Sequence, residues 1–207
     1  MINYETHLLF PTPLWKTNIK KELTENNLTI KNLIKDCLSI KQKDKGRKFS
    51  NKGANSYQSN DIYFDLKDQK LELCSLMRIV DNLVQSIYKN IWEGQIILDN
   101  SWININGKDS FNALHSHPQC VLSGCIYIKT PFRSGCFNAQ RNFNETFIYD
   151  NYGTPKKESP ESFITDNEIQ ITPKEGDIFV FPSHVIHRVK PNENNEERIS
   201  IAFNYVR

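Results

Sequence analysis

Three of the five histidines in this 207-residue chain are spaced in a way that suits metal binding. His115 and His117 lie two residues apart, and residues at that spacing in an extended strand share one face. Neutral imidazole is a common protein ligand for metals, so the pair can clamp one ion. His187 lies toward the far end of the same strand-rich region. We predict a metal site formed by these three side chains.

A fourth histidine, His184, is left out of the predicted site. It stands three residues before His187, and an extended strand cannot direct both side chains inward. His187 is the better ligand because it precedes Arg198 at the distance that a β-hairpin needs to bring the two together. We therefore expect His184 at the surface.

The last strand-like segment carries a second kind of chemistry. Its alternation puts Arg198, Ser200 and Asn204 on one face and apolar side chains on the other. An unpaired buried arginine is costly, whereas a guanidinium binds a carboxylate through two parallel hydrogen bonds. The pattern thus favours a cavity wall in which Arg198 and Ser200 hold an anion. The alternative is a surface ion pair of Arg198 with Glu196 or Glu197.

Two earlier segments also combine a polar or aromatic face with an apolar one. A single such face could simply contact water, but the same pattern in three segments favours a barrel that encloses a pocket. The residues on these two faces are Trp102, Asn104 and Asn106 in one segment and Cys125, Tyr127 and Lys129 in the other.

The chain from residue 96 onward has the period-two pattern of short strands. Eight such strands with polar turns predict a closed or double-sheet architecture, such as a jelly roll or cupin-like barrel. The mostly polar stretch 142–167 interrupts them, and we expect it to form a lid-like insertion. The expected strands are 97–106, 113–117, 120–129, 135–140, 168–172, 177–181, 184–189 and 198–206.

The first 95 residues have a different character. Two prolines in Leu8–Trp15 exclude a helix and favour an edge or cover strand. Apolar residues at helical spacing predict helices over about 22–41 and about 65–92, the second ending at Glu93-Gly94, with a loop over 42–60 between them. Both apolar stripes are interpreted as core packing.

Size and composition set limits on function. The length suits one domain over 1–207, in which 1–95 supports a β core over 96–207. A net charge of +2 argues against nucleic acid as a partner, and no segment resembles a membrane span or an export signal. We expect a cytoplasmic protein whose five cysteines are reduced, because they are odd in number and form no CxxC pair.

Several motifs together resemble the 2-oxoglutarate/Fe(II)-dependent oxygenase superfamily, and more narrowly oxygenases of marine bacteria and cyanophages. With Phe10-Pro-Thr-Pro near the start, the resemblance spans almost the whole chain. The run from Gly-Asp through Phe-Pro-Ser to Arg-x-Ser is its most specific part. The motifs are His115-Ser-His-Pro, Ser123-Gly-Cys-Ile-Tyr127, Glu175-Gly-Asp-Ile-Phe-Val-Phe-Pro-Ser183, His187-Arg-Val and Arg198-Ile-Ser-Ile-Ala-Phe-Asn204.

This resemblance implies a double-stranded β-helix with amino-terminal helices packed on its outside. It implies a dioxygenase that uses Fe(II) and the cosubstrate 2-oxoglutarate to hydroxylate an unknown prime substrate, with release of succinate and CO2. Small molecules are then the expected partners. An edge strand near Phe10–Trp15 leaves a homodimer open.

The resemblance also implies roles for individual residues. Arg198 and Ser200 would hold the tail carboxylate of 2-oxoglutarate. Tyr127 stands where such enzymes often have a hydroxyl donor to the same carboxylate. Asn104 and Asn204 would contact cosubstrate or substrate.

One position departs from the superfamily pattern. His187 matches the distal iron ligand and His115 the first, but the superfamily usually has Asp or Glu where this chain has His117. Three neutral ligands leave the metal centre more positive, so we expect weaker iron binding and competition from zinc or nickel. Asp109 is an alternative source of a carboxylate, although its spacing does not favour it.

Three other functions remain open from the sequence. A cupin-like three-histidine enzyme that does not use 2-oxoglutarate explains the ligands but gives Arg198 and Ser200 no purpose. A non-catalytic module would bind metal or 2-oxoglutarate without turnover. A jelly roll without metal would have a purely structural role.

Overall fold

Six strands form the larger of two sheets in the computed structural model, which describes residue 5 and residues 11–47, 50–62, 72–141 and 166–207. The central strand β11 (Arg198–Val206) pairs antiparallel with β4 (Ile97–Asn106) on one side and with β6 (Leu122–Lys129) on the other. In sheet order the strands are β1 (Trp15–Asn18), β9 (Asp177–Pro182), β6 (Leu122–Lys129), β11 (Arg198–Val206), β4 (Ile97–Asn106) and β3 (Ser56–Gln58).

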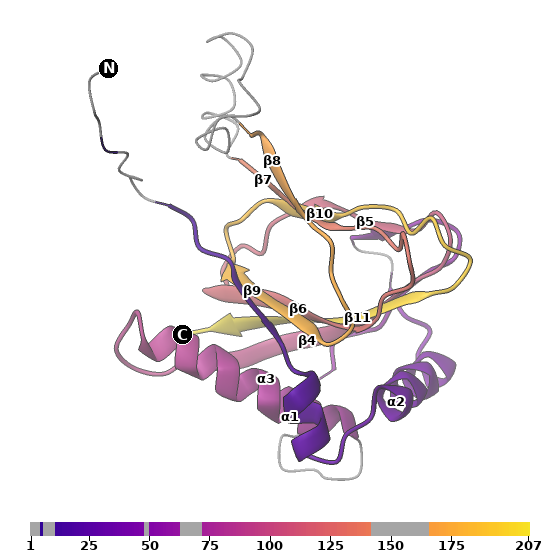
Figure 1. Ribbon diagram of the computed structural model, residues 1–207, viewed down its shortest axis with the longest axis horizontal. Helices are drawn as coiled ribbons and strands as arrows, with labels where there is room; N and C mark the ends of the chain where they lie inside the picture. The colour runs from indigo at the N-terminus through magenta and orange to yellow at the C-terminus, as the bar shows by residue number, and fades with distance from the viewer. Residues whose placement is uncertain (1–4, 6–10, 48–49, 63–71, 142–165) are drawn as a thin grey trace, which may run out of the picture.

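The smaller sheet faces the larger one across the interior of the molecule (Figure 1). From β4 to β11 the chain moves repeatedly between the two sheets, and the described pairings are antiparallel. This is the double-stranded β-helix that the sequence predicts. In sheet order the strands of the smaller sheet are β2 (Asn51–Lys52), β5 (Phe111–His115), β10 (His187–Val189), β7 (Phe137–Gln140) and β8 (Glu168–Ile171).

Three helices cover the outer face of the larger sheet (Figure 1). They are α1 (Lys20–Glu25), α2 (Ile30–Lys43) and α3 (Glu72–Lys89). The apolar stripe of α3, which includes Leu76 and Val80, packs in one core with Ile199, Ile201 and Phe203 of β11. Burial of this stripe holds the helices on the sheet, because each buried aliphatic side chain contributes about 1.5–3 kcal/mol.

A separate aromatic core lies between the two sheets. Tyr127, Phe137, Phe179 and Phe181 form it, and none of them belongs to the helix-facing core. The odd-numbered residues of β11 belong to the helix-facing core, and the even-numbered residues face the interior between the two sheets. The predicted division between a polar inner face and an apolar outer face of this strand is confirmed.

The helix expected over about 22–41 is instead two helices. Asn27 has a φ of 56°, a left-handed conformation that interrupts a right-handed helix. Thr29 then caps α2 by accepting a hydrogen bond from the Asn32 N–H at 3.2 Å. The single-helix prediction was wrong because the apolar spacing continues across the break.

The segment expected as a loop over 42–60 contains the short strands β2 and β3. Asp44 helps to hold it, because its carboxylate accepts hydrogen bonds from the backbone N–H groups of Gly46 and Asn60. Polar strands of two or three residues lack the alternation that identifies longer ones. The loop prediction was therefore wrong in part.

Other predicted boundaries vary in accuracy. Strands 97–106 and 198–206 are confirmed to the residue, and α3 lies within the predicted 65–92 and ends before Gly94 at φ 98°. Of the edge strand predicted over 8–15, residues 8–10 lie outside the described part of the chain, and among residues 11–15 only Trp15 belongs to a strand. Most of the predicted insertion 142–167 lies outside the described residues. None of the described helices has the length and apolar character needed to cross a membrane.

Candidate active site

The three predicted metal ligands meet on the smaller sheet, at the side that faces the interior. His187 of β10 lies directly opposite His115 of β5 in the antiparallel register, and their ring centroids are 4.4 Å apart. His117 completes the group, with centroids 4.9 Å from His115 and 5.2 Å from His187. One nitrogen from each ring lies within 4.8 Å of the others. A single metal ion fits among three nitrogens at such separations.

A bulge in β5 sets the direction of His115. His187 pairs with His115 but Val189 pairs with Asn112, so β5 has one residue more than β10 over this interval. Such bulges redirect side chains and are frequent beside active sites. The bulge brings both His115 and Asn112 to face the interior of the barrel.

Hydrogen bonds determine which ring nitrogen can bind metal. His115 Nδ1 lies 2.6 Å from the Ala113 carbonyl oxygen, and His187 Nδ1 lies 2.9 Å from the Val185 carbonyl oxygen. A carbonyl only accepts, so Nδ1 carries the proton in both rings. Nε2 is then left with a free lone pair, as a metal ligand requires.

His117 lies beyond the end of β5 rather than within a strand, so the prediction of a strand over 113–117 was wrong at its end. Its backbone N–H donates to the Ser183 carbonyl at 2.9 Å, which attaches this turn to the end of β9. The ring also lies beside Trp102, with centroids 5.8 Å apart. Contacts with the larger sheet, and not strand alternation, therefore place this imidazole.

Burial keeps the three imidazoles neutral. It lowers the pKa of His115, and burial with the neighbouring imidazoles lowers the pKa of His117 to about 4 and of His187 to about 3. The neutral form is the one that binds metal. Within the described residues no carboxylate joins this group, so Asp109 is not a member of it. The donor set thus fits a divalent transition metal held by three nitrogens.

Arg198 lies in the interior with only 1% of its surface exposed. Its Nη1 donates to the carbonyl oxygens of Ser134 and of Lys190, the latter at 3.1 Å. A Cβ at Gly135 would come within 2.7 Å of this nitrogen, so the glycine leaves room for the guanidinium. Nη2 is buried and has no hydrogen-bond partner among the described residues. A buried donor of this kind is suited to bind an anion from solution.

The alternative that Arg198 forms a surface ion pair was wrong. Glu196 pairs with Lys129 at 2.9 Å, and Glu197 pairs with Lys41 at 3.1 Å. Both carboxylates are engaged at the surface, whereas the guanidinium is buried.

Three more predicted residues form one row beside Arg198. Ser200 lies opposite Tyr127 of β6 and opposite Asn104 of β4. Burial raises the pKa of Tyr127 well above its usual value, so its hydroxyl keeps its proton and can donate to an anion. Asn104 Oδ1 accepts a hydrogen bond from Asn112 Nδ2 at 3.4 Å, which links this row to the strand that carries His115.

Asn204 is set apart from that row. Its Oδ1 accepts from Ser123 Oγ at 2.7 Å, and its Nδ2 donates to Asn100 Oδ1 at 2.9 Å. The Ser123 hydroxyl also lies 2.7 Å from the Ser183 hydroxyl. The sequence analysis did not select these two serines. The only signal was that Ser123 alternates with Cys125 and Tyr127 on one face.

A contact between Arg47 and Trp102, the residue whose ring lies beside His117, was not predicted from the sequence. The guanidinium of Arg47 lies 5.6 Å from the centre of the Trp102 ring and is bound to Asp61 through two hydrogen bonds of 2.6 and 3.0 Å. The indole N–H of Trp102 is buried and has no partner within the described part of the chain. Arg47 belongs to the segment expected as a loop, so no periodicity pointed to it.

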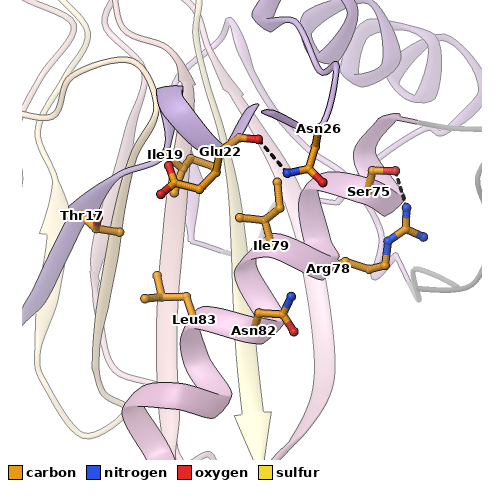
Figure 2. Close-up of a pocket in the computed structure, with 9 residues that line it drawn as sticks. All are labelled: Thr17, Ile19, Glu22, Asn26, Ser75, Arg78, Ile79, Asn82 and Leu83. Carbon is orange, nitrogen blue, oxygen red and sulfur yellow. Dashed lines mark hydrogen bonds between the residues drawn. The ribbon is translucent and has the colours of Figure 1, made fainter. Parts of the chain in front are cut away.

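A hollow of about 480 Å³ lies elsewhere, between the helices on the outer side of the larger sheet. Figure 2 shows that Ile79 and Leu83 of α3 and Glu22 and Asn26 near α1 border it. The larger sheet separates this hollow from the histidines, so it is not part of the same site.

Comparisons with known families and proteins bear on this geometry. A family model described as "Putative 2OG-Fe(II) oxygenase" matches residues 100–204, which is just over half of the chain. The match contains all three histidines, Arg198 and Ser200. No curated protein matches the sequence.

Solved structures with the same fold include several oxygenases. A prolyl-4-hydroxylase from Pseudomonas putida is 15% identical at a TM-score of 0.62, covering 95% of this chain and 94% of its own. A prolyl hydroxylase from Trichoplax adhaerens, solved with a hypoxia inducible factor peptide, is 14% identical at 0.61, covering 93% and 83%. HygX from Streptomyces hygroscopicus, solved with nickel and 2-oxoglutarate, is 11% identical at 0.56, covering 94% and 83%. At these identities the likeness concerns the fold.

Proposed function

The chain belongs to the 2OG-Fe(II) oxygenase family, and from this premise we propose that it hydroxylates a prime substrate while 2-oxoglutarate is converted to succinate and CO2. It is an oxidoreductase that uses Fe(II) and 2-oxoglutarate. The observation that carries the proposal is the group of three neutral imidazoles in the same interior as a buried arginine with an unpartnered nitrogen.

His115, His117 and His187 would hold the iron through one nitrogen each. When bound, Fe(II) would supply, with O2 as the oxidant and 2-oxoglutarate as the electron donor, the chemistry that puts one oxygen atom into a substrate C–H bond and the other into succinate. The Nδ1 hydrogen bonds of His115 and His187 keep their other nitrogens directed at the metal. These two ligands are thus oriented before the metal arrives, which reduces the entropy lost on binding.

Arg198, Ser200 and Tyr127 would bind the tail carboxylate of 2-oxoglutarate. Arg198 contributes a positive charge and the free Nη2 donor, and the two hydroxyls lie in the adjacent row. A carboxylate there would satisfy a buried donor that otherwise costs about 1–3 kcal/mol. Asn104, in the same row, is proposed as a further contact to cosubstrate or substrate.

Aromatic side chains would keep water from this interior. Phe137 stacks on the His187 ring with centroids 5.4 Å apart, and Phe181 lies 4.7 Å from the same ring. Exclusion of water strengthens the hydrogen bonds that orient the cosubstrate and protects reactive species from side reactions.

The absence of an acid from the ligand set has a predictable cost. Three neutral ligands leave the full charge of the metal uncompensated, so we propose weaker Fe(II) binding than at a site with two histidines and a carboxylate. A three-histidine enzyme that does not use 2-oxoglutarate would leave Arg198 Nη2 without a partner. The same observation therefore favours the oxygenase over that alternative.

The proposal is tested by adding Fe(II) and 2-oxoglutarate to the full chain without oxygen. We expect a weak visible charge-transfer band, followed on admission of air, with ascorbate present, by slow release of succinate. A band without succinate indicates a binding module instead of an oxygenase. Absence of both the band and metal uptake contradicts the proposed function.

A further inference from the structure

A chain of buried hydrogen bonds connects the centre of the larger sheet to the turn that carries His117. It runs from Asn204 on β11 to Ser123 on β6 and from there to Ser183 at the end of β9, with oxygen-to-oxygen distances of 2.7 Å at both steps. Ser123, Ser183 and Asn204 are 0, 1 and 5% exposed, so water does not compete for these bonds. The Ser183 carbonyl then accepts the backbone N–H of His117 at 2.9 Å.

The position of His117 depends on this connection. His115 and His187 lie in paired strands, but His117 lies beyond β5 and has no strand partner to fix it. Ser183 is itself held by its N–H bond to the Val121 carbonyl at 3.1 Å and by its hydroxyl bond to Ser123. The backbone acceptor of His117 is thus fixed through two strands of the larger sheet.

A neutral ligand gains more from such fixing than an acid would. A carboxylate is drawn to a cation by its charge, whereas an imidazole binds well only where its lone pair is already directed at the metal. Hydrogen bonds that are linked in a buried network also polarise and strengthen one another. The serine and asparagine chain supplies rigidity to the one ligand that strand pairing does not place.

We propose that Asn204 and Ser123 are positioning residues for the third metal ligand, acting through Ser183 on His117. This inference rests on the proposed metal site. It assigns to Asn204 a role different from the cosubstrate contact expected from the sequence, because both polar atoms of its side chain already have protein partners. The network also links the metal to β11, the strand that carries Arg198 and Ser200.

The test compares two buried serines in the full chain. Ser123→Ala removes the centre of the network. Ser59→Ala is the matched control, because Ser59 is also 0% exposed and accepts a hydrogen bond from the Ile103 N–H at 2.9 Å, but is no member of the network. Apoprotein is titrated with Co(II), which reports both affinity and ligand geometry through its visible absorption. We expect Ser123→Ala to weaken Co(II) binding by about 10- to 100-fold and to change the spectrum, and Ser59→Ala to do neither.

A double-mutant cycle separates positioning from general loss of stability. In a His117→Ala background the network has no ligand to place, so adding Ser123→Ala should then change the Co(II) affinity by less than about twofold. An equal loss in both backgrounds, or an unchanged spectrum in Ser123→Ala, overturns the inference and leaves the metal site intact. Wild-type protein that takes up no Co(II) overturns both the metal site and this inference. If Ser123→Ala does not fold, Ser183→Ala replaces it, because it removes the same hydroxyl contact from the other side.

Discussion

The two ends of β11 present opposite kinds of buried polar side chain to the interior. At the carboxyl end Asn204 has protein partners for both its oxygen and its nitrogen. At the amino end Arg198 uses Nη1 on two carbonyls, but its Nη2 has no partner in the described residues. A satisfied network holds its surroundings in place, whereas an unsatisfied buried donor is suited to a ligand. Under the two proposals, one strand carries a positioning end at Asn204 and a binding end at Arg198.

This difference has an energetic meaning. Leaving a buried donor unpaired costs about 1–3 kcal/mol, and the cost is recovered only when a ligand binds. Breaking a completed network imposes the same cost on the protein at all times. Substitution of Arg198 should therefore mainly weaken ligand binding, whereas substitution of Asn204 should mainly lower the free energy of unfolding.

The largest effect is expected from loss of a proposed metal ligand. His187→Ala should weaken metal binding by at least about 100-fold and abolish metal-dependent succinate release, because a direct ligand is lost. Metal stoichiometry and succinate assays measure this. His184→Ala is the control, since that side chain is exposed, and it should leave both unchanged. Unchanged iron content in His187→Ala would show that the ligand assignment is wrong.

The next effect separates the two ends directly. Arg198→Met should raise the Kd for 2-oxoglutarate by about 30-fold or more, since loss of a buried charged partner costs at least about 2 kcal/mol. Without ligand the variant should lose less stability than Asn204→Leu, because removal of an unsatisfied buried charge offsets the loss of the two hydrogen bonds that Nη1 donates. Asn204→Leu should instead lower the free energy of unfolding by about 1–3 kcal/mol. Calorimetry and urea unfolding measure both, and equal destabilisation would remove the distinction.

The smallest effect extends the comparison to a carboxylate whose partners are all in the protein. Burial alone would raise the pKa of Asp177, but hydrogen bonds from Asn18, the Lys174 N–H and Lys16 outweigh it and lower the pKa below its usual value. The resulting stability is present above the unfolded pKa and is lost as pH falls through the lower folded pKa. Asp177→Asn should therefore be less stable than wild type by about 1 kcal/mol at pH 7.

Unfolding in urea from pH 7 to pH 3 measures that difference. The gap between wild type and Asp177→Asn should narrow as the carboxylate of the wild type protonates. A gap that stays constant with pH would mean that charge contributes nothing at this position.

The sequence predicted those parts of the fold that repeat a regular pattern. The alternation in β4 and β11 was long enough to fix both strands to the residue, and the apolar stripe of α3 identified that helix. Short or interrupted elements were missed. The break at Asn27 depends on one backbone conformation, and β2 and β3 are too short to show a period.

The site was predictable to a similar extent. Residue types and spacing selected the three histidines, Arg198 and Ser200, and the structure brings the histidines together. The serines that support His117 were missed, as was Arg47 beside Trp102. Serine and loop arginine are common everywhere in a sequence, and only their contacts distinguish these.

The sequence by itself determined which donor groups this protein carries and which of them share a strand face, because residue types and their alternation are fixed by the order of residues. It provided three imidazoles as candidate metal ligands and a guanidinium on the face of a strand. Only the tertiary structure decided which buried polar groups are satisfied. Hydrogen-bond partners such as Asn204, Ser123 and Ser183 lie far apart in the chain, and they meet only when the strands pair. For that reason the unpartnered Nη2 of Arg198 and the support of His117 could be recognised only in the folded molecule.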